Sequence, residues 1–338
     1  MPLADATQSD VHTKRARAHP GAVRVVAPAR LHLGFLDLNG SLGRMFGSIG
    51  LAINRPRTEL VVRRARSFKG SGPDHARAIA ALQRFAEVFE VGGAYEVDVI
   101  SAIPAHAGLG SGTQLAVAAG AALAALEGID ATPTRLGEIL DRGARSAIGI
   151  GAFERGGFIV DGGRGERDRA PPVVVRADFP AAWRALLVMD NRSTGVHGDT
   201  ETKAFAALPP LPDSAAANIC RLVLMQLVPG LMEEDVDAFG NALTEIQKIV
   251  GNHFAGAQGG SPWASPAVGR VVETLRAAGG FGIGQSSWGP TGFAFAPTQE
   301  IAQRLYDSSI ELARGEGLEI MIVEGRNRGA VVEKIAST

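Results

Sequence analysis

The stretch IPAHAGLGSGTQ, residues 103–114, decides how the first half of the chain folds. Just before it, apolar and acidic residues alternate over positions 95–99, which is the period-two pattern of a half-buried strand. After it, apolar residues recur at helical spacing over positions 115–126, and Gly128 is placed to end that helix. The glycines of the stretch therefore lie between a predicted strand and the N-terminus of a predicted helix.

This turn is suited to hold a phosphate or a pyrophosphate. The first N–H groups of a helix have no backbone partner, and the helix dipole favours negative charge there. Glycine also lets a phosphate approach the backbone closely. Taken alone, the stretch favours an ordinary glycine-rich turn, and the rest of the chain changes that balance. The expected phosphate-binding residues are Gly108, Gly110, Ser111, Gly112 and Thr113.

Two better-known phosphate motifs are excluded. None of the five lysines follows a glycine, so the chain has no G-x-x-x-x-G-K-[ST] motif. A dinucleotide-binding G-x-G-x-x-G would be followed by a second strand and an acidic residue, but here an alanine-rich helix follows.

Composition narrows the class of protein. The 338 residues are enough for two domains, and a formal net charge of −1 gives no general attraction to nucleic acid or to anionic membranes. The single cysteine, Cys220, excludes an internal disulfide and a cysteine-built zinc site, and we interpret it as a core residue. No apolar run approaches the length of a membrane span, and residues 1–20 lack the apolar segment of a secretory signal, so we expect a cytoplasmic protein.

Strands and helices are interleaved without strict alternation, which predicts an α+β fold. We expect a disordered lead over residues 1–20, an N-terminal domain with the phosphate loop over 21–172, and a C-terminal domain over 173–338. Within these, residues 48–54 and 58–63 are predicted to form two separate strands. Residues 213–227 are predicted to form a helix that ends at the Pro229-Gly230 pair.

Three other segments carry polar residues of the kind that bind substrates. Residues 30–44 hold Arg30, His32, Asp37 and Arg44 in a glycine-broken stretch. If the stretch is extended, Arg30 and His32 point to the same side, and Asp37 and Arg44 could face each other across a turn. A solvated hairpin with a surface ion pair is an equally good interpretation of these residues.

The second segment is a glycine-rich loop at residues 284–292. Its amide, hydroxyl and indole groups suit an oxygen-rich ligand, although a plain turn has the same composition. The third segment, residues 186–195, is a weak match to the ribose-phosphate motif of phosphoribosyltransferases, with a strand and polar turn as the alternative. The seven histidines show no metal-binding spacing. The candidate residues of the two loops are Gln285, Ser286, Ser287, Trp288, Asp190 and Arg192.

The chain resembles the GHMP kinase superfamily in two of these motifs, the loop at 104–113 and the glycine loop at 284–292. Within that superfamily, three blocks are similar to those of the β-ribofuranosylaminobenzene 5′-phosphate synthases. The blocks lie at residues 30–44 (R-L-H-x-G-x-x-D-x-x-G-x-x-G-R), 49–53 (I-G-L-A-I) and 284–291 (G-Q-S-S-W-G-P-T). The resemblance runs from about Val23 to the C-terminus. It implies a two-domain fold, with an N-terminal domain like ribosomal protein S5 domain 2, a ferredoxin-like C-terminal domain, and the site in the cleft between them.

The resemblance also implies a reaction of methanopterin biosynthesis. Phosphoribosyl pyrophosphate would react with 4-aminobenzoate or 4-hydroxybenzoate, releasing pyrophosphate and carbon dioxide and leaving a carbon–carbon bond between ribose and ring. Such chemistry needs charge stabilisation on the pyrophosphate, usually with Mg²⁺, and no organic cofactor. The expected partners are these small molecules, and a homodimer is expected. Neither nucleic acid nor membrane is an expected partner.

The roles that this reaction suggests for the matched residues are hypotheses. The amides of residues 108–113 would bind pyrophosphate, and Asp37 would stabilise the sugar cation or hold the metal. Arg30 or Arg44 would pair with phosphate or carboxylate, and His32 would donate to an oxygen. The loops at 190–199 and 284–289 would close on the ribose 5-phosphate.

One departure from the superfamily pattern bears on the reaction. Kinases of the superfamily usually continue G-L-G-S-S with small residues, whereas this chain has Gly112, Thr113 and Gln114. That difference favours a branch that does not use ATP. An ATP-dependent small-molecule kinase is the alternative enzyme, and a non-catalytic protein that binds a phosphorylated metabolite is a third hypothesis.

Overall fold

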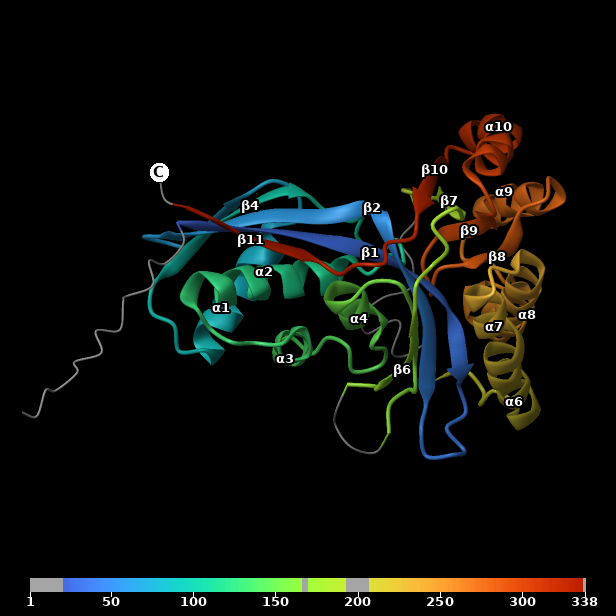
Figure 1. Ribbon diagram of the computed structural model, residues 1–338, viewed down its shortest axis with the longest axis horizontal. Coiled ribbons are helices and arrows are strands. Elements are labelled where there is room, and N and C mark those ends of the chain that lie inside the picture. Colours follow the sequence, from blue (N-terminus) through green and yellow to red (C-terminus); the bar gives the residue numbers. More distant parts are fainter. Residues whose placement is uncertain (1–20, 166–169, 193–206, 337–338) are drawn as a thin grey trace, which may run out of the picture.

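The computed structural model describes residues 21–165, 170–192 and 207–336. The predicted lead at 1–20 lies outside these residues, as does most of the polar loop after Asp190. Within the described residues the chain forms a seven-stranded sheet and a four-stranded sheet, each covered by helices (Figure 1).

The strands are β1 (Ala22–Asp37), β2 (Phe46–Ala65), β3 (Lys69–Ser71), β4 (Ala94–Ser101), β5 (Phe158–Asp161), β6 (Val173–Ala177), β7 (Arg184–Met189), β8 (Phe281–Gln285), β9 (Thr291–Ala296), β10 (Glu319–Glu324) and β11 (Val331–Ile335). The longer helices are α1 (His75–Val88), α2 (Ser111–Glu127), α6 (Asp213–Leu222), α8 (Val236–Phe254), α9 (Pro266–Ala277) and α10 (Gln299–Gly315). The shorter helical segments are α3 (Pro133–Ile139), α4 (Ile148–Glu154), the π-helix η1 (Val223–Leu227), α7 (Val228–Met232) and the 3₁₀ turn η2 (Ala255–Gln258).

The first sheet has the strand order β11-β1-β2-β4-β3, with β5 paired to β2 and β6 paired to β5. Helices α1 to α4 lie along one side of it (Figure 1). The alternation predicted for residues 95–99 is confirmed, since Tyr95, Val97 and Val99 are buried against α1 and α2. Helix α2 ends at Gly128, which has a φ of 71° as the sequence predicts for its C-terminus.

The second sheet has the order β10-β7-β9-β8, and its three pairings are antiparallel. Along β7, Leu186 and Val188 face α9 and α10, whereas Ala185, Leu187 and Met189 face the opposite side. With α6 to α9 between β7 and β8, and α10 between β9 and β10, this is the βαββαβ order of a ferredoxin-like domain. The α+β prediction is therefore confirmed.

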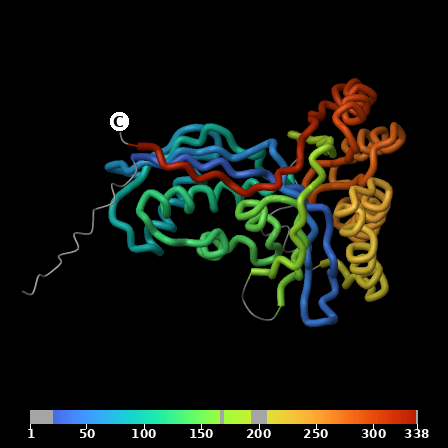
Figure 2. Tube along the Cα trace, viewed as in Figure 1, coloured from blue at the N-terminus to red at the C-terminus, as the bar shows by residue number. Residues whose placement is uncertain are grey.

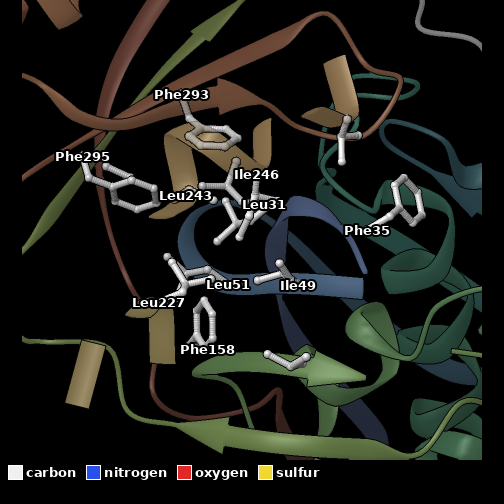
Figure 3. Close-up of a cluster of buried hydrophobic side chains, with 14 of the residues drawn as sticks. Leu31, Phe35, Ile49, Leu51, Phe158, Leu227, Leu243, Ile246, Phe293 and Phe295 are labelled. Atoms are coloured by element: carbon white, nitrogen blue, oxygen red, sulfur yellow. The ribbon is translucent and has the colours of Figure 1, made fainter. Parts of the chain in front are cut away.

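The two sheets share one hydrophobic core because β1 and β2 are long enough to serve both. Leu31 of β1 and Ile49 of β2 belong to one cluster with Leu243 and Ile246 of α8 and with Phe293 and Phe295 of β9 (Figure 3). The C-terminal half of β1, the N-terminal half of β2 and the second sheet thus form a continuous apolar cluster. This packing fixes the position of residues 30–35 relative to the loop that joins β8 and β9.

Several sequence predictions need correction. Residues 48–54 and 58–63 belong to one strand, β2, because Pro28 pairs with Arg57 and Ala29 with Ile53, so that residues 54–56 bulge out of a continuous ladder. The boundary at 172 and 173 does not follow the sheets. Both β6 and β11 join the first sheet, and the C-terminal segment runs back across the molecule to lie beside β1 (Figure 2).

The helical region that begins at Asp213 also differs from the prediction. It continues through η1 and α7 to Met232, because Pro229 lies in the first turn of α7, where its missing N–H costs nothing. By length and composition this stretch could cross a membrane, so the expectation that no apolar run is long enough is wrong on that criterion. Its Ala216, Ile219 and Leu227 side chains nevertheless lie in the shared core.

Candidate active site

A cleft of about 480 Å³ lies where the central part of β1 meets the two glycine-rich loops. Two loops and the N-terminus of α2 form its walls, and the segment between α3 and α4 closes one side. Its lining residues include Arg30, His32, Phe35, Phe46, Arg77, His106, Gly108, Gly110, Ser111, Gly112, Thr113, Asp141, Arg142, Arg145, Ser146, Ser287, Trp288 and Gly289.

The two glycine-rich loops touch each other through their backbones. A Cβ atom on Gly108 would lie 2.2 Å from the Ser286 carbonyl oxygen, and a Cβ atom on Gly289 would lie 2.5 Å from the Ala107 carbonyl carbon. Gly108 also has a φ of 77°, which favours glycine. These glycines are therefore needed to bring the two predicted loops together.

Hydrogen bonds join both loops to β1. The Ser286 hydroxyl donates to the Gly108 carbonyl oxygen at 2.6 Å and accepts from the His32 N–H at 3.0 Å. The Arg30 guanidinium also donates to the Gly108 carbonyl oxygen, at 2.6 Å, and the Arg30 N–H donates to the Leu109 carbonyl oxygen. The structure thus brings Arg30, His32, Ser286 and the phosphate loop together, as the sequence predicts.

One end of the cleft is strongly cationic. A Cβ atom on Gly112 would lie 2.9 Å from Arg77 Nη2 and 3.7 Å from Arg142 Nη1. Helix α2 begins at this point with no side-chain cap and no acidic residue in its first turn. Desolvation within the cleft and, after it, the charge of Arg77 lower the pKa of Arg142, although that side chain keeps some contact with solvent.

The other end of the cleft is aromatic. The Trp288 ring stacks on Phe254 with ring centroids 4.1 Å apart and planes 19° apart. Phe35 lies edge-on to Phe254 and within 4.5 Å of the His32 ring, measured between centroids. Phe46 adds a further ring, 6.4 Å from Phe35. The lining of the cleft therefore combines flat apolar side chains beside His32 with arginines at the start of α2.

His32 is held neutral. Only 3% of its surface is exposed, and burial, followed by the charge of Arg30, holds its pKa well below the ordinary value. Its Nδ1 atom is buried and has no hydrogen-bond partner in the described part of the chain. A neutral imidazole with an unused polar atom at the junction of the two ends is suited to meet a polar group of a ligand.

Backbone strain gathers at the same place. Four residues that line the cleft, Phe46, His106, Asp141 and Ser287, have φ values between 53° and 75°, although none of them is glycine. Such conformations persist where the surrounding structure holds them, and they cluster at functional sites. The strain therefore supports the assignment of this cleft as the active site.

Two predicted catalytic residues do not reach the cleft. The Asp37 carboxylate accepts from the N–H groups of Asn39 and Gly40, at 2.7 and 3.0 Å. The Arg44 guanidinium donates to the carbonyl oxygens of Gly162 and Gly163. The expectation that Asp37 and Arg44 face each other is wrong, because each of these side chains is held by nearby backbone groups instead.

Three of the predicted binding residues are also used within the C-terminal domain. Asp190 accepts hydrogen bonds from Arg192 and from the Ser265 hydroxyl, and the bond from Arg192 is the main reason that its pKa is lowered. The Gln285 side chain accepts from the Ala264 N–H and donates to the Gln258 side chain. None of the three lines the cleft, whereas Ser287 and Trp288 do.

Three arginines that line the cleft were not predicted from the sequence, namely Arg77, Arg142 and Arg145. Arg77 lies on α1, which shows an ordinary amphipathic pattern, and nothing in that pattern marks this arginine. The pair Arg142 and Arg145 does carry a local signal. These two arginines lie on either side of a Gly-Ala pair just before the short helix α4. Glycines also precede α2, so both segments have the composition of a turn that leads into a helix.

The cleft does not fit a divalent cation held by the protein. Mg²⁺ in proteins takes oxygen ligands, usually one or two carboxylates together with substrate phosphates. Among the described lining residues the cleft offers a single carboxylate, Asp141, next to Arg142. In the described residues no group of three or more acidic, histidine or cysteine side chains could hold a metal. The expectation of Mg²⁺ therefore stays a prediction.

Comparison with known proteins identifies both the fold family of this chain and a group of more similar relatives. The family model for the GHMP kinases N terminal domain matches residues 75–157, and the model for the GHMP kinases C terminal domain matches residues 227–309. Among solved structures, a homoserine kinase from Cytophaga hutchinsonii has a TM-score of 0.67 at 19% identity, covering 94% of this chain and 99% of that one. Mevalonate kinase from Methanococcus jannaschii has a TM-score of 0.62 at 13% identity, covering 92% of this chain and 100% of the other.

The fold and the two glycine loops therefore place the chain in the GHMP kinase superfamily. Two curated relatives share 32% of their residues with it over 329 positions, one from Archaeoglobus fulgidus and one from Methanothermobacter thermautotrophicus. The matches cover 92% and 91% of this chain and 99% and 97% of the relatives, and both relatives are named beta-ribofuranosylphenol 5′-phosphate synthase. The chain belongs to the family of these synthases.

Proposed function

We propose that this protein transfers the ribosyl 5-phosphate group of phosphoribosyl pyrophosphate to a para-substituted benzoate, with release of pyrophosphate and carbon dioxide. The observation that carries the proposal is the polarity of the cleft. Its arginines suit a diphosphate at one end, and its aromatic rings suit a flat acceptor at the other. A ligand that spans both ends places its reacting carbon beside Arg30 and His32.

The proposed reaction does not need a general acid or a general base. The ring carbon that bears the carboxylate attacks ribose C1, and the electron pair of the breaking C1–O bond leaves on the pyrophosphate. The bond between ring and carboxylate then breaks, its electron pair restores the aromatic ring, and carbon dioxide departs. A neutral His32 and a cationic Arg30 are suited to hold the acceptor and to balance developing negative charge.

The acceptor is proposed to be 4-hydroxybenzoate, since the relatives' name refers to a ribofuranosylphenol and a phenol is the product of that acid. With 4-aminobenzoate the product would be the corresponding aniline. A place in methanopterin biosynthesis, a cytoplasmic location, a homodimer and a Mg²⁺ cofactor all remain predictions.

The test is incubation with phosphoribosyl pyrophosphate and carboxyl-labelled benzoates. Labelled carbon dioxide and pyrophosphate should form in equal amounts from 4-hydroxybenzoate or 4-aminobenzoate. Unsubstituted benzoate should be inert, because its ring carbon lacks electron donation from the para position. Comparable turnover of plain benzoate, or a product that keeps its carboxylate, would contradict the mechanism. ATP-dependent phosphorylation of a small alcohol would instead support the kinase alternative.

A further inference from the structure

The cationic end of the cleft is made by elements that are far apart in the sequence. Arg77 comes from α1, Arg142 from the segment before α4, and Gly112 from the first turn of α2. Both guanidinium groups lie within reach of one point, the position that a Cβ atom on Gly112 would occupy. Three separate elements thus direct positive charge at the same small volume.

The described protein groups neutralise only part of the positive charge of these two arginines. Arg77 Nη1 donates to the Asp74 carboxylate at 3.2 Å, and its Nη2 is the atom nearest Gly112. The Arg142 guanidinium donates no hydrogen bond to any described residue, although Asp141 is its neighbour in sequence. Two like charges are held together only at a cost, so their convergence points to an anion as the missing partner.

Hydrogen bonds to a buried carboxylate hold the C-terminal end of the segment that carries Arg142. The buried Asp161 carboxylate accepts from the Ala147 N–H at 2.8 Å and from the Ser48 N–H at 3.1 Å. It also accepts from the Ser146 hydroxyl and from the Gly163 N–H. The end of the segment is thereby fixed against β2 before any ligand arrives. A site held in this way is preorganised for its ligand.

We propose that Arg77 and Arg142 form a diphosphate clamp over Gly112, and that this clamp binds pyrophosphate without a divalent cation. Each of the two arginines can offer paired N–H donors to phosphate oxygens. The cleft has too few carboxylates to hold a metal ion in this role. The independent sign of a ligand in the same cleft is His32 Nδ1, buried and unpartnered. The identity of the donor substrate rests on the proposed function, but binding of inorganic pyrophosphate does not.

During transfer the clamp meets the charge that the reaction creates. As the C1–O bond of the phosphoribosyl donor breaks, its electron pair moves to the bridging oxygen of the diphosphate, whose negative charge grows. The guanidinium groups of Arg77 and Arg142 are placed to stabilise that charge. Pyrophosphate binding by the clamp should therefore continue when divalent cations are chelated.

The experiment is titration of the full-length protein with inorganic pyrophosphate by calorimetry, in buffer containing EDTA. The wild-type protein should bind, and Arg77→Gln and Arg142→Gln should each weaken binding by on the order of 10²-fold. Arg84→Gln is the matched control, because Arg84 lies on the same helix as Arg77 and pairs with the exposed Glu87. Its affinity for pyrophosphate should equal that of wild type.

Two results would overturn the clamp. One is pyrophosphate binding that needs added Mg²⁺, and the other is normal binding by both folded arginine variants. The outcomes separate the clamp from the proposed function. Metal-free binding that is lost in both variants, in a protein that transfers no ribosyl group, supports the clamp and contradicts the function. Ribosyl transfer that stops in EDTA, together with normal pyrophosphate binding by the variants, supports the function and contradicts the clamp.

Discussion

Ser286 holds the three parts of the active site together, so its hydroxyl offers a sharp test of the structure. The side chain is fully buried, and its hydroxyl accepts from the His32 N–H and donates to the Gly108 carbonyl oxygen. In Ser286→Ala the His32 N–H loses this acceptor, whereas the Gly108 carbonyl oxygen keeps its bond from Arg30. Leaving one buried polar group unsatisfied costs about 1–3 kcal/mol, so the free energy of unfolding should fall by that amount.

The assay is urea unfolding together with steady-state kinetics. Because the loss also loosens the phosphate loop against β1, KM for phosphoribosyl pyrophosphate should rise by about tenfold or more. Ser309→Ala is the matched control, since Ser309 is also fully buried but lies in α10, where its hydroxyl is hydrogen-bonded to the Ser308 hydroxyl and not to the active site. It should leave KM unchanged. Unfolding and KM values of Ser286→Ala equal to those of wild type would refute this account of the junction.

Two further predictions concern the cationic end and His32. Gly112→Ala should keep or raise the free energy of unfolding, because Gly112 lies in α2, but its methyl group would lie 2.9 Å from Arg77 Nη2 and should weaken pyrophosphate binding about tenfold. Unchanged affinity in calorimetry would mean that the anion does not lie over Gly112. Because the pKa of His32 is lowered in the folded protein, the unfolded chain takes up the proton first as the pH falls. The free energy of unfolding should therefore decrease below about pH 6.5, by up to about 1.4 kcal/mol for each pH unit, and His32→Gln should show a shallower slope. Identical slopes for both proteins would contradict a neutral buried His32.

The parts of the site that the sequence predicted are those encoded locally. The change from strand to helix periodicity around residues 103–114 places the phosphate loop without any knowledge of the fold, and α2 begins at Ser111 as expected. The same holds for the second glycine loop, between β8 and β9. The sequence predicts that Gly108 binds phosphate and places Gly289 within a glycine-rich loop, but it does not predict that the two loops meet at these glycines, because that contact depends on the tertiary structure.

The parts that could not be predicted depend on distant elements. Arg77 and Arg142 meet only because α1 and the segment before α4 both lie beside the start of α2. The pairing of β11 with β1 joins residues about 300 positions apart in sequence, as the bond between Arg24 and Glu333 illustrates. The prediction that Asp37 and Arg44 face each other was wrong for a different reason. Backbone groups accept from or donate to both side chains instead.

A crystal structure of a dead-end complex would show whether the diphosphate and the aromatic acceptor occupy opposite ends of one cleft. Phosphoribosyl pyrophosphate and unsubstituted benzoate should bind together without reacting. We predict that the diphosphate lies within hydrogen-bond distance of Arg77 and Arg142, and that the benzoate ring packs against Phe35 and Trp288. A diphosphate bound at Asp190 and Arg192 instead, or a benzoate ring outside this cleft, would contradict the account.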